Sequence, residues 1–168
     1  MTNMDNGWNL NLAVLVLRLG VAYVFLYAAW KNTENAAAWK WTVDETALLF
    51  KTWPDPQREK LARLCALAGM AMMYGGAASI LTGIEPRLGG LLIAVFSFMG
   101  MKVHAIRREE AKLAGEAGNM MGWSAFSGHV AAGLKNWALA AAGLFFLLVG
   151  SGRYGLQIDF VGRWLGWN

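Results

Sequence analysis

Long apolar stretches separated by polar segments dominate the hydropathy pattern of this chain. An α-helix rises about 1.5 Å per residue and the hydrocarbon core of a bilayer is roughly 30 Å thick, so about 20 apolar residues span it. The uncharged run Leu64–Ile84 meets this requirement on its own. The pattern predicts an all-α, integral membrane four-helix bundle that forms a single membrane domain over residues 1–168. Its helices are expected at about 10–31, 61–84, 87–106 and 134–150.

Two longer polar segments connect these predicted helices. The first, 32–60, is rich in Trp, Lys and acidic residues, and the two prolines of a Trp-Pro-Asp-Pro sequence stop any regular helix there. The second, 107–133, begins with charges and continues with many glycines and small polar residues. We expect its glycine-rich part, 115–133, to be interfacial or partly re-entrant, although hydropathy also allows one long kinked helix from about 120 to 150.

Small residues recur on one face of three predicted helices. Because lipid tails are as apolar as leucine, close backbone approach at small residues replaces hydrophobic burial as the force that associates helices in membranes. The regular spacing of these residues therefore predicts where the helices pack against each other. The predicted contact positions are Gly69, Gly76 and Gly83, then Gly90, Ala94, Ser97, Met101 and His104, then Asn136, Ala140, Gly143 and Gly150.

Composition supports the membrane assignment and narrows the partners. Hydrophobic residues make up 57% of the chain and charged residues 15%, which is too apolar for a soluble domain of this size. Many of the nine Trp residues lie at the ends of apolar runs, as in the aromatic belts of membrane interfaces. The net charge of +4 therefore indicates contact with anionic lipids, and we expect no nucleic acid partner. The single cysteine, Cys65, excludes an intrachain disulfide or dithiol redox site.

The distribution of positive charge predicts an orientation in the membrane. Most Lys and Arg residues lie in or beside the first and third connections, and few lie on the opposite side. Because loops rich in Lys and Arg remain in the cytoplasm, the two long connections are predicted to be cytoplasmic and both termini outside.

Arg18, inside the first apolar stretch, is the clearest candidate for function. A charge at membrane depth costs roughly 2.5–3.5 kcal/mol on insertion scales, so such residues are usually kept for a purpose. One interpretation is contact with an anion, a quinone headgroup or a carboxylate, with Asp159 as a candidate partner. The other is an arginine whose side chain snorkels to the nearer membrane surface, about 12 Å away.

His104 and His129 are the only histidines, and both are expected near the same membrane surface. Two neutral imidazoles from different helices can ligate haem or copper. Because His104 falls on a small-residue face, a hydrogen bond between helices is the simpler interpretation, and we favour neither copper nor haem. The nine Met residues do not alter this preference, since Met commonly fills space between membrane helices.

The two ends of the chain carry more specific motifs. The first helix has an arginine, a following glycine, an aromatic-rich turn and a closing lysine over residues 17–31. The tail contains Gly-Ser-Gly-Arg-Tyr-Gly from residue 150, followed by Asp159. Together with the turn that contains Gly83 and Pro86, these motifs resemble the DoxX/DoxD-like family of four-helix membrane proteins.

The resemblance implies a small membrane subunit of a quinone-linked redox complex, like the DoxD subunit of thiosulfate:quinone oxidoreductase, in the cell membrane of a bacterium or archaeon. It implies other membrane or redox subunits as partners and quinone as the bound molecule, with no intrinsic cofactor. A homo-oligomer is compatible with the same pattern. The residues implied in binding quinone or a partner are Arg18, Lys31, Arg153, Tyr154 and Asp159.

A purely structural role is the alternative. The small-residue faces, the abundant Trp and the lack of a cofactor motif in the sequence equally fit an accessory subunit with no chemistry of its own. Such a subunit would fill space and contact lipid in a larger respiratory, photosynthetic or oxygenase assembly. Whether the chain is part of an enzyme therefore stays open from the sequence.

Overall fold

The computed structural model describes residues 4–166, which are largely helical and contain no strand. Four of the helices are apolar and long enough to cross a membrane, which confirms the predicted all-α bundle and makes the chain a multi-pass membrane protein. In chain order the elements are α1 (Met4–Thr33), α2 (Ala36–Ala47), the 3-10 helix η1 (Leu48–Phe50), α3 (Asp55–Thr82), α4 (Pro86–Glu116), α5 (Met120–Val149) and α6 (Phe160–Trp164).

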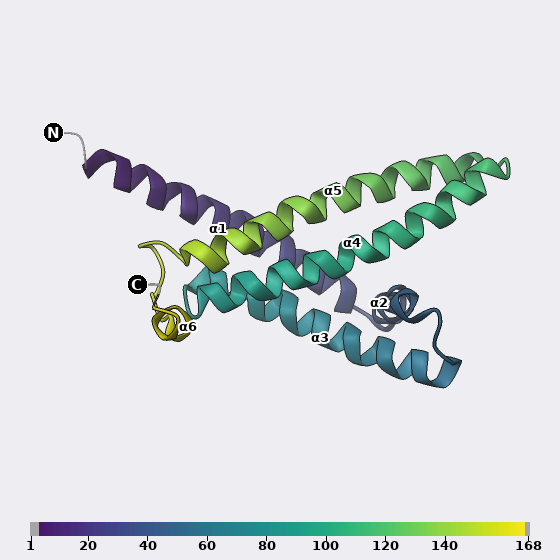
Figure 1. The fold of residues 1–168 in the computed structure, drawn as a ribbon, viewed down its shortest axis with the longest axis horizontal. Helices are drawn as coiled ribbons and strands as arrows, with labels where there is room; N and C mark the ends of the chain where they lie inside the picture. The colour runs from purple at the N-terminus through teal and green to yellow at the C-terminus, as the bar shows by residue number, and fades with distance from the viewer. Residues whose placement is uncertain (1–3, 167–168) are drawn as a thin grey trace.

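The long helices pack in sequence rather than in a closed ring. α4 and α5 form an antiparallel hairpin, α3 packs on α4, and α1 packs on α3 but touches α5 only briefly. α3 and the hairpin lie together at one end and diverge at the other, where α2 lies between them (Figure 1). The core lies where the helices converge, with Ile80, Ile93 and Phe146 fully buried.

Glycines allow the backbones of neighbouring helices to touch. A Cβ atom at Gly90 would lie 2.5 Å from the carbonyl oxygen of Gly143, and one at Gly143 would lie 2.7 Å from the carbonyl oxygen of Gly90. A Cβ at Gly76 of α3 would lie 3.1 Å from the carbonyl oxygen of Gly89 in α4. Gly83 ends α3 at φ 79°, a conformation that favours glycine. These contacts confirm that the small residues mark packing faces.

The segment 115–133 is not re-entrant, because it forms the last residues of α4, a short turn and the start of α5. A short turn joins α4 to α5, so the polar connection expected at 107–133 is helical over most of its length. The alternative was one long kinked helix from about 120 to 150, and α5 confirms a continuous helix with nearly these bounds, Met120–Val149. Glycine serves close packing here, because a Cβ at Gly122 would collide with the backbone nitrogen of Gly115.

The segment 32–60 is also more helical than expected, because it contains α2 and the start of α3. The side chain of Asn35 accepts an amide hydrogen bond at the beginning of α2, as an N-cap residue does. The prolines start a helix rather than end one. Pro54 is the N-cap of α3, and Pro56 lies in its first turn, where the missing N–H would have no helical partner.

Candidate functional site

Arg18 lies inside the protein, with 1% of its surface exposed. Its Nε donates to the carbonyl oxygen of Ile80 at 2.6 Å, its Nη2 to that of Leu81 at 2.6 Å, and its Nη1 to that of Ser151 at 3.0 Å. Ile80 and Leu81 are in the last turn of α3, where carbonyls lack helical partners and carry the negative end of the helix dipole. Arg18 therefore caps α3 and connects it to the segment after α5. Of the two interpretations of Arg18, the snorkelling side chain is therefore wrong, because the guanidinium binds buried and partly buried carbonyl groups.

Asp159, considered above as a partner of Arg18, pairs with Arg87 instead. The Nε of Arg87 lies 2.8 Å from Oδ2 of Asp159, and the arginine side chain is 8% exposed. Its Nη1 also donates to the carbonyl oxygens of Leu147 and Leu148 near the end of α5. Arg87 thus stabilises the end of α5 as Arg18 stabilises the end of α3. Sequence reasoning missed this role, although an arginine in the first turn of an apolar helix was a usable signal.

The tail of the chain is fastened to the turn between α3 and α4. Glu85 adopts a left-handed backbone conformation at φ 49°. Its carboxylate accepts the amide protons of Phe160, at 2.6 Å, and Val161, at 3.2 Å. An isolated parallel bridge also joins Ile84 to Ile158. Many polar groups at this end of the molecule are therefore engaged in holding the fold together.

The residues implied by the family resemblance lie at two different ends of the molecule. Arg153 and Tyr154 are exposed beside α1, where the backbone nitrogen of Arg153 donates to an α1 side chain at 3.0 Å. Arg18 and Asp159 belong to the same end. Lys31 lies more than three turns beyond Arg18 on α1, roughly 20 Å away, and forms an exposed ion pair within its own turn. The five residues therefore do not converge on one site.

The two histidines meet at the opposite end, where α3 diverges from the α4–α5 hairpin. His104 lies on α4 and His129 on α5, and their Nδ1 atoms are 3.3 Å apart. Both residues are half-buried. The predicted hydrogen bond between helices at His104 is confirmed.

The geometry of the two rings fits a hydrogen bond between the facing nitrogens. The ring centroids are 5.6 Å apart and the nitrogens 3.3 Å apart. The distance between the centroids exceeds the distance between the nitrogens by about 2.3 Å. Each nitrogen lies roughly 1.15 Å from the centre of its ring, and two such lengths make up this difference. Both Nδ1 atoms therefore lie close to the line that joins the two ring centres. A metal ion on that line would need about 4 Å between the nitrogens, since each metal–nitrogen bond is about 2.0 Å long. Residues 4–166 also contain no group of three or more His, Cys, Asp or Glu placed to hold a metal.

The histidine pair borders a cavity of about 450 Å³ between α2, α3, α4 and α5. Cavities of this size accommodate small molecules and cofactors, and they are usually apolar with a few polar groups that orient the ligand. This one has that character. We call it the histidine cavity, and its lining includes Trp41, Glu45, Leu49, Cys65, Met70, Phe96, Met99, Val103, His104, Arg107 and His129.

An ion-pair network holds α2 and the segment after it against α4, beside the histidine cavity. The Nε of Arg107 lies 3.1 Å from both carboxylate oxygens of Glu45, and its Nη1 lies 2.9 Å from Oε2 of Glu110. Lys51 pairs with Glu110 as well. The planar guanidinium matches a carboxylate in this paired geometry, which adds directional strength to the contact. The network therefore fixes the helix that forms one wall of the cavity.

Comparisons with known proteins leave the family unassigned. A scan against protein-family models finds no match, and no curated protein or solved structure shows significant similarity to the chain. Membership of the DoxX/DoxD-like family therefore stays a prediction from the motifs.

Proposed function

We propose that this chain is the small quinone-binding membrane subunit of a redox complex, with the quinone headgroup in the histidine cavity. The proposal retains the function implied by the DoxX/DoxD-like resemblance, with a bacterial or archaeal cell membrane as its location and the long connections in the cytoplasm. It moves the binding site from Arg18 and the tail to His104 and His129. The observation that carries the proposal is the hydrogen-bonded imidazole pair at the edge of a largely apolar cavity.

The histidine pair suits both redox forms of a quinone. In a pair of neutral rings joined through Nδ1, the donating ring has a bare Nε2 and the accepting ring carries its proton on Nε2. The pair therefore offers one hydrogen-bond donor and one acceptor. A quinone carbonyl needs a donor and a quinol hydroxyl needs an acceptor, so one arrangement of side chains serves both molecules.

The rest of the cavity suits a flat, lipid-soluble ring. Met70, Phe96, Met99 and Val103 contribute to its apolar surface, and methionine adapts its shape to an aromatic ligand. His104 lies roughly 27 Å along α4 from Pro86, near the far side of the hydrocarbon core. A quinone that diffuses in the membrane would reach the pair with its headgroup close to the lipid headgroups.

Reduction of a bound quinone takes up two electrons and two protons. The electrons would come from a redox-active partner subunit, in keeping with the class of complex that the resemblance implies. The protons can pass through the imidazoles, because each neutral ring carries one donor and one acceptor nitrogen. The chain would then contribute binding and proton supply rather than the electron carrier, which makes it a subunit of an oxidoreductase rather than a complete enzyme.

Calorimetric titration of the full chain in nanodiscs with decylubiquinone tests the proposal. We expect saturable binding to the wild type and about tenfold weaker binding to His129→Ala, because a partly buried hydrogen bond to the quinone is lost. Met101→Ala is the matched control, since Met101 lines a different cavity on the other side of the histidine pair. It should bind within about twofold of the wild type.

Two results would contradict the proposal. If the wild type does not bind decylubiquinone, the chain fits the structural accessory role better than a quinone subunit. If the wild type and His129→Ala bind equally well, the quinone site lies elsewhere on the protein and the role assigned to the histidine pair is wrong.

A further inference from the structure

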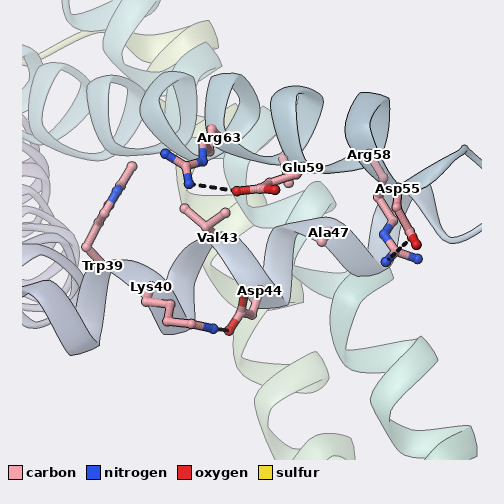
Figure 2. A pocket seen from close by; sticks show the side chains of 10 residues that line it. Trp39, Lys40, Val43, Asp44, Ala47, Asp55, Arg58, Glu59 and Arg63 are labelled. Carbon is pink, nitrogen blue, oxygen red and sulfur yellow. Dashed lines mark hydrogen bonds and ion pairs between the residues drawn. The ribbon is translucent and has the colours of Figure 1, made fainter.

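A groove of about 480 Å³ lies between α2 and the first turns of α3, on a different face of α2 from the histidine cavity (Figure 2). Its floor is apolar, because Val43 is only 9% exposed and Ala62 is completely buried. Its rim carries three cations and three carboxylates, so its net charge is zero. We call it the α2–α3 groove, and its charged residues are Lys40, Asp44, Asp55, Arg58, Glu59 and Arg63.

The charges on the rim are held in exposed pairs within single helices, drawn as dashed lines in Figure 2. Nη2 of Arg63 lies 2.7 Å from Glu59, and Nζ of Lys40 lies 2.6 Å from Asp44. More than half of each of these side chains is exposed. Exposed ion pairs of this kind are weak, so a ligand that carries both charges can take their place.

The α2–α3 groove lies where α3 enters the membrane. The uncharged run of α3 begins directly after Arg63. At about 1.5 Å per residue, Glu59 and Arg63 lie within roughly 8 Å of that boundary, which is the depth of the lipid headgroup layer. One turn deeper on the same face of the helix, Leu67 is 57% exposed and offers an apolar surface to a lipid chain.

We propose that the α2–α3 groove binds a phospholipid whose headgroup carries a phosphate and a primary ammonium, as phosphatidylethanolamine does. The phosphate binds to Arg58 and Arg63, because guanidinium groups match phosphate oxygens in paired hydrogen bonds. The ammonium donates to Glu59, whose partner Arg63 turns to the phosphate, and to Asp44, which lines the same groove and is paired with Lys40. One acyl chain follows the exposed surface at Leu67 towards the hydrocarbon core.

Charge balance selects this headgroup over the alternatives. An anionic headgroup or free phosphate would draw Arg58 and Arg63 from their carboxylate partners and give the groove a net negative charge, whereas a headgroup that also carries an ammonium leaves it neutral. A choline headgroup has the required charges, but its trimethylated nitrogen cannot donate a hydrogen bond. The site is independent of the proposed quinone function, because the α2–α3 groove and the histidine cavity share no lining residue.

Native mass spectrometry of the delipidated full chain tests the proposal with four separate probes: phosphatidylethanolamine, phosphatidylcholine, phosphatidylglycerol and inorganic phosphate. We expect phosphatidylethanolamine to bind about fivefold more tightly than either other lipid. Inorganic phosphate should not displace it at the same concentration. This comparison distinguishes binding of the lipid from binding of free phosphate.

Two double variants separate the two halves of the headgroup. Arg58→Gln with Arg63→Gln removes the phosphate ligands and should weaken binding of all three lipids. Asp44→Asn with Glu59→Gln removes the ammonium ligands and should reduce phosphatidylethanolamine binding to the level of phosphatidylcholine. All four side chains are on the surface, and an unchanged melting temperature establishes that each variant folds.

The matched control replaces another exposed pair, Lys112 and Glu116 on α4, by Gln at both positions. It should bind all lipids as the wild type does. Equal binding of phosphatidylethanolamine and phosphatidylcholine, tighter binding of phosphatidylglycerol or phosphate, or groove variants that match the control would each overturn the proposal. A failure of decylubiquinone to bind in the histidine cavity would not affect this result.

Discussion

Replacement of Arg18 by Met should destabilise the protein far more than loss of an exposed charge. Met keeps much of the side-chain volume but donates no hydrogen bond, so the carbonyl groups of Ile80, Leu81 and Ser151 each lose a donor. The contacts to Ile80 and Ser151 are buried and the contact to Leu81 is partly buried, so water does not readily replace the guanidinium. The substitution therefore removes both the cap of α3 and its connection to the segment after α5.

The three hydrogen bonds set the size of the effect. Hydrogen bonds between membrane helices average about 0.6 kcal/mol in double-mutant cycles, so three of them give a lower bound of roughly 2 kcal/mol. Bonds to charged groups contribute about 1.5–3 kcal/mol each, while removal of the charge relieves roughly 2.5–3.5 kcal/mol of insertion cost. We expect the free energy of unfolding to fall by about 2–5 kcal/mol.

Steric trapping in bicelles measures this change in the free energy of unfolding. Lys31→Met is the control on the same helix, because the contacts of Lys31 with Glu34 and with the Trp30 ring are at the surface, so the substitution should leave stability close to that of the wild type. Arg18→Lys should restore only part of the lost stability. Its ammonium group still donates hydrogen bonds, but it lacks the planar fork with which a guanidinium reaches several carbonyls. If Arg18→Met is as stable as Lys31→Met, the carbonyl contacts do not stabilise the fold and the reasoning is refuted.

Three further variants probe other contacts. Gly143→Leu should force α5 away from α4 and lower the stability by about 1–3 kcal/mol in a melting experiment. Gly133→Leu is the control, because a side chain at that position meets open space and should not lower the stability. Equal melting temperatures of the two variants would contradict the packing argument. Asp159→Asn should loosen the tail from its arginine partner and increase proteolytic cleavage after α5; unchanged cleavage would mean that the other tail contacts suffice. Glu45→Gln should loosen α2 and speed maleimide labelling of Cys65 in the histidine cavity, unless packing alone holds α2.

Hydropathy predicted the number and type of the long helices, because a membrane span needs an uninterrupted apolar run whose backbone groups bond to each other. It failed where helices extend beyond the bilayer. The end of α4 and the start of α5 are polar or glycine-rich, so their hydropathy is low. A hydropathy average does not reveal the close contact between Gly115 and Gly122 that holds these two helical ends together. The charged start of α3 was missed for the same reason.

The polar contacts were predictable only in part. The spacing of His104 along the small-residue face was enough to indicate a contact between helices, since residues on one face meet the same neighbour. The partner of an arginine depends on proximity in three dimensions and on acceptors that a side-chain pattern does not contain. Arg18 binds backbone carbonyls, and Asp159 belongs to Arg87 because the tail folds back over the turn that precedes α4.

The cap made by Arg18 has a consequence for biosynthesis. Its acceptors follow it in the chain by 62 residues at Ile80 and by 133 residues at Ser151. At about 5–20 residues per second, the ribosome makes the first acceptor roughly 3–12 s after Arg18 and the last roughly 7–27 s after it. During this interval the guanidinium of Arg18 lacks its carbonyl acceptors, and an unpaired charge opposes stable insertion of α1 into lipid. We therefore expect α1 to be fully anchored only after the ribosome has passed the end of α5.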